Sequence, residues 1–264
     1  MNEKTGMLQH TRFLLYFFLM PARRLYGLIG FPLGHTFSPG YFNAKFGREE
    51  VDAEYKAFPL ATISELPQLL ELYPHLAGLN VTTPYKEQVM HLLDDCDDVA
   101  ARVGAVNCIR ISDGKTKGYN TDVIGFEQSL EPLLKPGMDE AIVLGTGGAA
   151  RAVRYVLDKK NITYINVSRT NSGDAITYNE LTEEMVRTHR LIINTTPLGM
   201  YPCTETYPPI PYHAITDAHL VYDLIYNPEF TTFLQKGHQR GAVTKNGMEM
   251  LELQAEASWG IWNS

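Results

Sequence analysis

The sequence from Ala141 to Ala150 reads Ala-Ile-Val-Leu-Gly-Thr-Gly-Gly-Ala-Ala. Its four apolar residues predict a short buried strand, and the residues after the glycines, to about Lys160, predict a helix. In a strand–turn–helix unit of this kind, Gly145 allows the tight turn and Gly147 lets the backbone approach a pyrophosphate. The phosphates then meet the helix N-terminus. The segment therefore predicts a dinucleotide site, against the alternative of a glycine-rich turn that binds nothing.

The residues that distinguish NAD from NADP are expected directly after the next predicted strand, residues 163–167. An NAD site is expected to carry an acidic residue about 20 residues past the glycines, where it holds the ribose 2′-hydroxyl. Here Arg169 follows Gly145 by 24 residues, and no acid is adjacent. A guanidinium suits the 2′-phosphate of NADP, with the Thr170 hydroxyl as a helper. The alternative is that Arg169 is a solvated loop charge.

Around this unit, short apolar runs alternate with helical patterns along the chain. Such alternation predicts parallel βαβ units and a doubly wound α/β fold. We expect strands at 25–30, 54–58, 76–81, 141–144, 163–167, 191–194 and 220–224, and a hairpin from 106–111 and 116–119. We expect helices from 38, at 63–72, 83–93, from 121, and at 148–160, 181–188, 228–236 and 247–262. Ser38, Thr83 and the pair Thr121-Asp122 have the residue types of helix N-caps.

Length and composition limit the class of protein. A chain of 264 residues predicts two domains. The formal net charge is −7 and no block of five like charges occurs, so we expect no nucleic-acid partner. Three cysteines without a Cys-x-x-Cys pair predict a reducing compartment, the cytoplasm, with no disulfide framework or zinc site. No histidine pair has metal-binding spacing, so no metal is expected.

The N-terminal segment from Phe13 to Met20 is apolar. Eight residues are too few for a bilayer crossing, which needs about 20, so we expect no membrane association. Arginines follow at 23 and 24 without a small-x-small cleavage site. We expect an extra edge strand or an upstream start codon with Met20 as the functional start; an export signal is the alternative.

Polar residues gather at the ends of the first predicted strands. Lys86 is expected in the first turn of a helix, where the helix dipole disfavours a cation, so it needs an anionic partner. Ser38, with Thr36, lies in a turn before a helix, and Asp122 opens another. The alternatives are that Ser38 and Asp122 only cap helices and that Lys86 lies on the surface.

Taken together, these segments resemble the shikimate dehydrogenase family from about Leu25 to Trp262. The matching motifs are Gly30 to Pro39, Asn80 to Lys86, Gly104 to Asn107, Asn120 to Val123, Gly145 to Ala152, Asn194 to Met200, Tyr226 to Pro228 and Asn246 to Gln254. The resemblance implies an N-terminal α/β substrate domain (1–121), a Rossmann-like NADP-binding domain (122–244) and a C-terminal helix that returns to the first domain (245–264). It also implies the NADPH-dependent, reversible reduction of 3-dehydroshikimate to shikimate, a step of chorismate and aromatic amino-acid biosynthesis, by a monomer or homodimer.

The resemblance also assigns roles to residues. It implies that Lys86 and Asp122 are the catalytic pair. The residues implied for the substrate are Thr36 and Ser38 at its carboxylate, then Thr82, Lys86, Asn107, Asp122 and Gln254 at its hydroxyls, with Tyr226 nearby. Those implied for NADP are Gly145, Thr146, Gly147, Gly148, Ala149, Ser168, Arg169, Thr170, Asn194, Thr195, Thr196, Pro197, Met200 and Gly247.

Four positions depart from the family pattern. Thr36 replaces a serine, Val123 replaces a glycine, Arg169 lacks the second cation of many NADP-using members, and Gly237 replaces an alanine. Thr36 and the single cation leave open a quinate/shikimate dehydrogenase with broader NAD(P) use. A non-catalytic NADP-binding sensor is an alternative of another class. A folate dehydrogenase of similar architecture would have no evident use for Thr36, Ser38 and Gln254.

Overall fold

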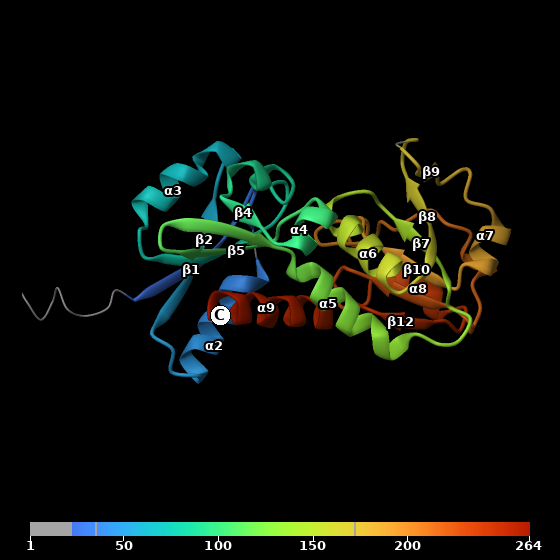
Figure 1. Ribbon diagram of the computed structural model, residues 1–264. Helices are drawn as coiled ribbons and strands as arrows, with labels where there is room; N and C mark the ends of the chain where they lie inside the picture. Colours follow the sequence, from blue (N-terminus) through green and yellow to red (C-terminus); the bar gives the residue numbers. More distant parts are fainter. Residues whose placement is uncertain (1–22, 35, 172) are drawn as a thin grey trace, which may run out of the picture.

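The computed structural model describes residues 23–34, 36–171 and 173–264. Within them the chain forms two six-stranded sheets, one in each half of the molecule (Figure 1). The expectations for residues 13–20 lie outside the described residues. Figure 1 shows α5 and α9 running between the two halves, and the two helices pack against each other.

The first sheet is mixed. Its strands are β1 (Arg24–Gly30), β2 (Ala53–Pro59), β3 (Leu76–Val81), β4 (Asp95–Cys96), β5 (Cys108–Ser112) and β6 (Lys115–Tyr119), in the order β2-β1-β3-β5-β6-β4. β1 pairs in parallel with β2 and β3, whereas β5 and β6 form the expected antiparallel hairpin. The carboxyl ends of β1 and β3 therefore meet at one edge of the sheet, where Thr82 lies beside Gly30.

The second sheet is parallel throughout. Its strands are β7 (Glu140–Leu144), β8 (Thr163–Ser168), β9 (Ile176–Thr177), β10 (Leu191–Asn194), β11 (Leu220–Asp223) and β12 (Val243–Lys245), in the order β12-β11-β10-β7-β8-β9. The order reverses at β7, so the sheet is doubly wound as predicted. Ligands of such sheets bind outside the carboxyl ends of the strands at this switch point. Here that point lies between β7 and β10.

Helices cover both faces of each sheet. The α-helices are α2 (Phe37–Arg48), α3 (Leu66–Leu72), α4 (Asp98–Val103), α5 (Thr121–Leu130), α6 (Gly148–Lys159), α7 (Glu183–Thr188), α8 (Thr232–His238) and α9 (Met248–Trp262). Short 3₁₀ helices are η1 (Ile63–Glu65), η2 (Gln88–Leu92), η3 (Glu131–Leu133) and η4 (Tyr212–Ala214). In the first half, α3 packs on one face while α2 and α9 pack on the other. In the second half, α5 and α6 share one face and α7 and α8 the opposite one.

The C-terminal helix α9 docks on the first sheet through its last turn. The Trp262 ring stacks on Tyr26 of β1 at 4.8 Å between centroids, and its indole N–H donates to the Ile109 carbonyl at 3.0 Å. At its other end, α9 crosses α5 where Gly125 faces the Met250 carbonyl. Because a side chain on Gly125 would occupy the position of that carbonyl, glycine is what lets the two helices approach closely.

Two expected helix starts near the site are wrong. The helix expected with Ser38 as its N-cap and Pro39 as its first residue begins two residues earlier, at Phe37, with Thr36 at the N-cap position. Pro39 is tolerated there because the first four helical N–H groups need no intrahelical partner. The helix expected from Thr83 to 93 does not form at its start, and only η2 begins, at Gln88. The cause is long-range: the Lys86 carbonyl accepts the Val106 N–H at 2.7 Å, so it is not part of a helix.

Two further helix starts are corrected in the same way. Asn120, not Thr121 or Asp122, caps α5, because its side chain accepts the Val123 N–H. The helix expected at 228–236 is α8, which begins at Thr232 with Thr231 as its cap. Among the described residues, no helix combines the length and apolar character that a bilayer crossing needs.

Candidate active site

Lys86 and Asp122 form a close ion pair. The Lys86 Nζ lies 2.6 Å from the Asp122 Oδ2, and the side chains are 20% and 9% exposed. Lys86 comes from the loop after β3 and Asp122 from the first turn of α5, which are joined only through the fold. The predicted partner of Lys86 is therefore Asp122, although Lys86 does not lie in a helical turn. Since Asn120 caps α5, the Asp122 carboxylate is not needed as a cap.

Asn107 orients this carboxylate from the other side. Its Nδ2 donates to the Asp122 Oδ1 at 2.8 Å and to the Thr121 Oγ1 at 3.0 Å. Its Oδ1 accepts the Thr121 N–H at 2.6 Å. Asn107 is 3% exposed, so its amide is fixed among protein partners. Through its bond to Asp122, Asn107 orients the carboxylate that pairs with Lys86.

A buried hydrogen-bond network connects α9 to the same place. The Gln254 Oε1 lies 3.4 Å from the Asn107 Nδ2, and its Nε2 donates to the Leu251 carbonyl. Ser258, which is fully buried, lies 3.1 Å from the Thr121 Oγ1 and accepts from the Asn80 Nδ2 at 3.0 Å. Asn80 and Ser258 were not predicted as site residues. Their signal in the sequence was weak, since single amides and hydroxyls in a strand and a helix are common.

The predicted carboxylate-binding residues lie at the start of α2. Thr36 occupies the N-cap position, and among the described residues its side chain makes no capping hydrogen bond. Ser38 faces the buried Tyr55 hydroxyl, whose pKa is raised well above its ordinary value by burial, with Ser38 opposing the shift. Between them, the Phe37 ring meets Tyr226 edge-on at 6.1 Å between centroids. Tyr226 follows β11, so this contact joins the two halves.

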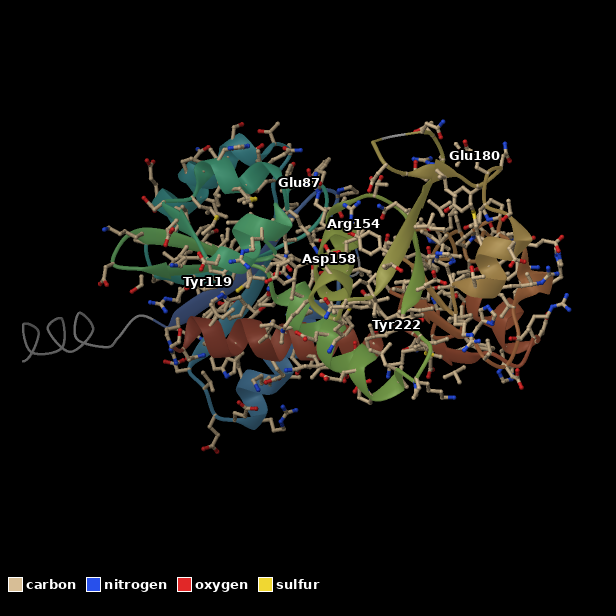
Figure 2. All side chains as sticks on the ribbon, turned by 45° about the vertical axis from the view of Figure 1, so that its right-hand side comes forward. Glu87, Tyr119, Arg154, Asp158, Glu180 and Tyr222 are labelled. Atoms are coloured by element: carbon tan, nitrogen blue, oxygen red, sulfur yellow. The ribbon has the colours of Figure 1, made fainter. Side chains whose placement is uncertain are left out.

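The glycine turn of the second half lies near Lys86. A Cβ placed on Gly148, the first residue of α6, would lie 3.6 Å from the Lys86 Cβ and Cδ. The next residue of the first half, Glu87, binds Arg151 of α6 at 2.8 Å between Oε2 and Nη2. Figure 2 shows Glu87 at this junction of the two halves. The Lys86 side chain therefore lies near the start of α6.

The same turn is open to solvent at Thr146 and Gly147. Gly147 is exposed, and a Cβ added there would meet no atom of the described residues within 4 Å. Gly145 has a φ of +110°, which only glycine adopts readily, and faces the Thr195 hydroxyl. Thr146 is also exposed and Ala149 is half-buried. These features fit the pyrophosphate of a dinucleotide at the N-terminus of α6.

The loop after β10 borders this turn. Pro197 and Met200 are exposed, and Thr195 and Thr196 are half-buried. Asn194 is fully buried, and its side chain is bonded to Thr196 and to Asp223. Asn194 therefore shapes the loop and offers no free group to a ligand. Gly247 is likewise buried, against the Leu224 carbonyl, where no side chain would fit.

The predicted 2′-phosphate residues follow β8. Arg169 and Thr170 are exposed, whereas the Ser168 hydroxyl is taken by the Thr170 backbone. The N–H of Gly145 donates to the Val167 carbonyl at 2.8 Å, so this segment is adjacent to the glycine turn. Arg169 therefore lies in the loop that follows the strand next to the glycine turn.

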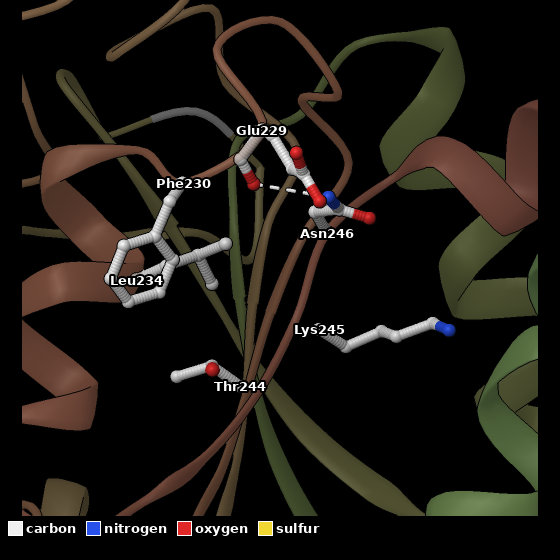
Figure 3. A pocket seen from close by; sticks show the side chains of 6 residues that line it. All are labelled: Glu229, Phe230, Leu234, Thr244, Lys245 and Asn246. Carbon is white, nitrogen blue, oxygen red and sulfur yellow. Dashed lines mark hydrogen bonds between the residues drawn. The ribbon is translucent and has the colours of Figure 1, made fainter.

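Two surface hollows of about 350 Å³ each contain none of the predicted site residues. The first, shown in Figure 3, is lined by Glu229, Phe230, Leu234, Thr244, Lys245 and Asn246. Two of its polar side chains have protein partners, since Asn246 donates to the Glu229 carbonyl and Lys245 pairs with Glu249. In residues 23–34, 36–171 and 173–264, no cluster of three or more His, Cys, Asp or Glu could hold a metal.

Two features define the class of protein. One is a parallel sheet with a glycine turn at its switch point, and the other is a nearby lysine–aspartate pair from a second α/β half. The protein is a two-domain, dinucleotide-dependent oxidoreductase. A family profile described as "Shikimate dehydrogenase substrate binding domain" matches residues 28–109.

Comparisons with whole proteins specify the class further. The chain is 38% identical over 258 residues to shikimate dehydrogenase (NADP(+)) of Methanococcus maripaludis, covering 90% of this chain and 91% of the relative. The crystal structure of shikimate dehydrogenase from Aquifex aeolicus is similar with a TM-score of 0.82 and 35% identity, covering 93% and 94% of the two chains. That of the Thermus thermophilus enzyme, in complex with NADP(H) and shikimate, has a TM-score of 0.80 and 27% identity, covering 90% and 93%. The chain belongs to the shikimate dehydrogenase family.

Proposed function

We propose that this protein catalyses the NADP-dependent, reversible reduction of 3-dehydroshikimate to shikimate, a step of chorismate and aromatic amino-acid biosynthesis. The observation that carries the proposal is the Lys86–Asp122 pair, 2.6 Å apart, whose lysine lies so near the first residue of α6 that a Cβ on Gly148 would meet it at 3.6 Å. Proton donor and dinucleotide turn thus come from different halves and meet at one place. The relatives named above, including one crystallised with NADP(H) and shikimate, support the same reaction.

The catalytic pair supplies the proton. When bound, NADPH supplies the hydride to the carbonyl carbon of the substrate. Charge then develops on the carbonyl oxygen, and the Lys86 ammonium can donate a proton to it. Asp122 holds the Lys86 Nζ in position and can accept a hydrogen bond from a substrate hydroxyl. Asn107 fixes the Asp122 carboxylate for both tasks.

The remaining substrate contacts follow from the fold. Thr36 and Ser38, at the N-terminal end of α2, are suited to the substrate carboxylate because both offer hydroxyls where a helix attracts an anion. The residues proposed at the ring hydroxyls are Thr82, Lys86, Asn107, Asp122 and Gln254. Tyr226 is proposed to border the substrate from the second half, next to Phe37.

The cofactor site uses the switch point of the second sheet. We place the pyrophosphate on Gly145 to Ala149 and the 2′-phosphate at Arg169 and Thr170. Loop residues 194–200 are proposed to lie along the nicotinamide half of NADP. Ser168, Asn194 and Gly247 are proposed to act by shaping these loops, because their side chains or backbone are bound within the protein.

One kinetic matrix tests this function: kcat/KM for shikimate and for quinate, each with NADP and with NAD. We expect the highest value for shikimate with NADP. Comparable values for quinate or NAD would favour the broader quinate/shikimate dehydrogenase, which Thr36 and the single cation at Arg169 motivate. Dinucleotide binding without any turnover would favour a non-catalytic sensor.

The dinucleotide position has its own test. Gly147→Ala has room in the ligand-free protein, so its melting temperature should stay that of the wild type, whereas its new methyl would lie where the pyrophosphate approaches. We expect NADP binding to weaken at least tenfold. Gly47→Ala, which also has open space but lies in the last turn of α2, is the matched control. Equal NADP affinity in both variants would contradict this placement.

The proposal also covers the compartment, the domain boundaries and the assembly of the protein. We place the protein in the cytoplasm, which the three unpaired cysteines support. We propose domains 1–121, 122–244 and 245–264, because β6 ends at Tyr119, β12 ends at Lys245 and α9 then returns to the first sheet. A monomer or homodimer remains the proposed assembly, to be measured by light scattering.

A further inference from the structure

Asp223 is a fully buried carboxylate that the catalytic scheme does not use. It ends β11 and has no exposed surface. Three donors surround it: the Asn194 Nδ2 at 3.0 Å, the Ile225 N–H at 3.1 Å and the Thr231 hydroxyl at 2.6 Å. Burial raises its pKa to about 6, with the three hydrogen bonds opposing the shift. A desolvated carboxylate at this position is costly, and its partners indicate what it holds in place.

Its first partner, Asn194, controls the loop after β10. The two residues are opposite each other in the pairing of β10 with β11. The Asn194 Oδ1 accepts both the N–H and the hydroxyl of Thr196, at 3.0 and 2.7 Å. The Thr196 hydroxyl in turn accepts the Leu198 N–H at 3.3 Å. One amide side chain therefore sets the course of the loop from Thr195 to Leu198.

The orientation of that amide depends on Asp223. A carboxylate only accepts hydrogen bonds, so the Asn194 NH₂ must face Asp223 and its oxygen must face Thr196. Without the carboxylate, the Asn194 NH₂ loses this acceptor, and only the contacts with the loop itself still favour this orientation. Turning over would bring its NH₂ against the Thr196 N–H, two donors face to face. The loop would then lose the hydrogen bonds that fix it at Thr196.

The loop controlled in this way is the one beside the dinucleotide turn. The Thr195 hydroxyl lies 2.5 Å from the position of a Cβ on Gly145 and donates to the Leu144 carbonyl. We propose that Asp223 is a positioning residue for the cofactor, which fixes the Asn194 amide and so holds the 195–198 loop against the glycine turn in the shape that receives NADP. The proposal rests on the proposed function, since it presupposes a dinucleotide at this switch point.

The test is the NADP dissociation constant, measured by calorimetry, in the wild type and in Asp223→Ala, Asp223→Asn and Thr231→Val. We expect Asp223→Ala to weaken NADP by about fivefold or more, because Asn194 is left with an unpaired donor. Asp223→Asn should stay within about twofold. Its amide oxygen can still accept from Asn194 and Ile225 while its NH₂ faces Thr231, whose hydroxyl can accept. If Asp223→Asn retains the NADP affinity that Asp223→Ala loses, the effect of Asp223 comes from its hydrogen bonds and not from its charge.

Thr231→Val is the matched control for general loosening. It removes one bond to Asp223 and the N-cap of α8, but leaves the bond to Asn194. Its melting temperature should fall while its affinity for NADP stays that of the wild type. In Asp223→Ala, the KM for NADP should rise while kcat at saturating NADP and the KM for shikimate change less than about twofold, because Lys86 and Asp122 are outside the network.

Two results would overturn the proposal: affinity for NADP within twofold of the wild type in Asp223→Ala, or an equal loss in Thr231→Val. If Asp223→Ala does not fold, Asn194→Ala decides, since Asp223 then keeps Ile225 and Thr231. We expect the same loss of affinity, and an unchanged affinity would overturn the proposal equally. Failure of the wild type itself to bind NADP would instead contradict the proposed function.

Discussion

At the scale of single residues, the site depends on a lysine and an aspartate whose charges satisfy each other. Lys86 approaches Asp122 at 2.6 Å from a loop, and Asn107 holds the second carboxylate oxygen. Because Asn120 performs the capping of α5, the Asp122 carboxylate is left for Lys86 and Asn107. The effects of mutations at 122 on catalysis and on folding can therefore be separated.

Lys86→Ala should lower kcat by about 10²–10⁴, the usual contribution of a positioned proton donor, while NADPH affinity stays unchanged. Asp122→Asn should also lower kcat, with little change in melting temperature because the cap is Asn120. The double variant should be little worse than the poorer single one, since the residues act as a unit. Steady-state kinetics, NADPH titration and thermal melts of the three variants check this; strictly additive rate losses would contradict the pairing.

Arg169→Ala should weaken NADP about 10–150-fold and leave NAD nearly unaffected. The reason is that a hydrogen bond to a charged group contributes about 1.5–3 kcal/mol, and only NADP carries the 2′-phosphate. Dissociation constants for both dinucleotides, measured side by side, test this. A wild-type preference for NAD would show that Arg169 does not select the cofactor.

At the scale of elements, two helical glycines have opposite surroundings. Gly40 in α2 has open space where a Cβ would be, whereas Gly125 in α5 faces the Met250 carbonyl of α9. Neither has a positive φ. The same substitution therefore measures helix propensity at one position and the α5–α9 contact at the other.

Gly40→Ala should raise the free energy of unfolding by up to about 1 kcal/mol, because alanine is the better helix former. Gly125→Ala should lower it by about 1–3 kcal/mol, because the two helices must move apart. Urea denaturation of both variants is the measurement. Stabilisation by Gly125→Ala would mean that α9 does not pack on α5 at this distance in solution.

The helices and strands also show which parts of the fold can be predicted from the sequence alone. The glycine turn, the parallel strands around it and the hairpin were predictable because their signals are local: apolar runs, turn residues and glycines. The helix start at Thr83 was wrong because the Lys86 carbonyl is bonded to Val106, a partner that is distant in sequence. The short strand β12 was missed because three residues carry no periodic pattern.

The site residues also fall into those with a local sequence signal and those without one. Lys86, Asp122 and Asn107 could be named from motifs, and the structure brings them together with Gln254. Ser258 and Asp223 could not be named, because each acts through a neighbour whose position depends on the sheet pairing or on the docking of α9. The ion pair was expected for an incorrect local reason, a helix dipole at Lys86, and is held by tertiary structure instead.

At the scale of the whole molecule, one buried group makes stability depend on pH. The pKa of Asp223 is raised from 3.8 to about 6 in the folded protein, chiefly by burial. Because the pKa is higher in the folded state, the native protein keeps a proton on Asp223 between about pH 4 and pH 6, whereas the unfolded chain has lost it. Its contribution to the free energy of unfolding is therefore full below about pH 4 and declines as pH rises to about 6.

Asp223→Asn should remove this dependence. A pKa difference of one between the folded and unfolded states corresponds to about 1.4 kcal/mol, so the wild type should lose about 3 kcal/mol relative to the variant between pH 4 and pH 7. Urea denaturation of both proteins at several pH values in this window tests the sign and the size. A parallel pH dependence in the two proteins would show that Asp223 does not titrate there.

The docking of α9 also determines when in the life of the polypeptide the site can exist. Gln254 and Ser258 complete a network that begins with residues near position 80, so the first half depends on a segment that is synthesised after both sheets. A nascent chain can form both sheets early, yet Asn80, Thr121 and Asn107 stay without their final partners until α9 emerges. Premature termination between Asp122 and Gln254 would leave a chain with its Lys86 and Asp122 but without this closing segment. Synthesis through α9 is thus a condition for completing this network.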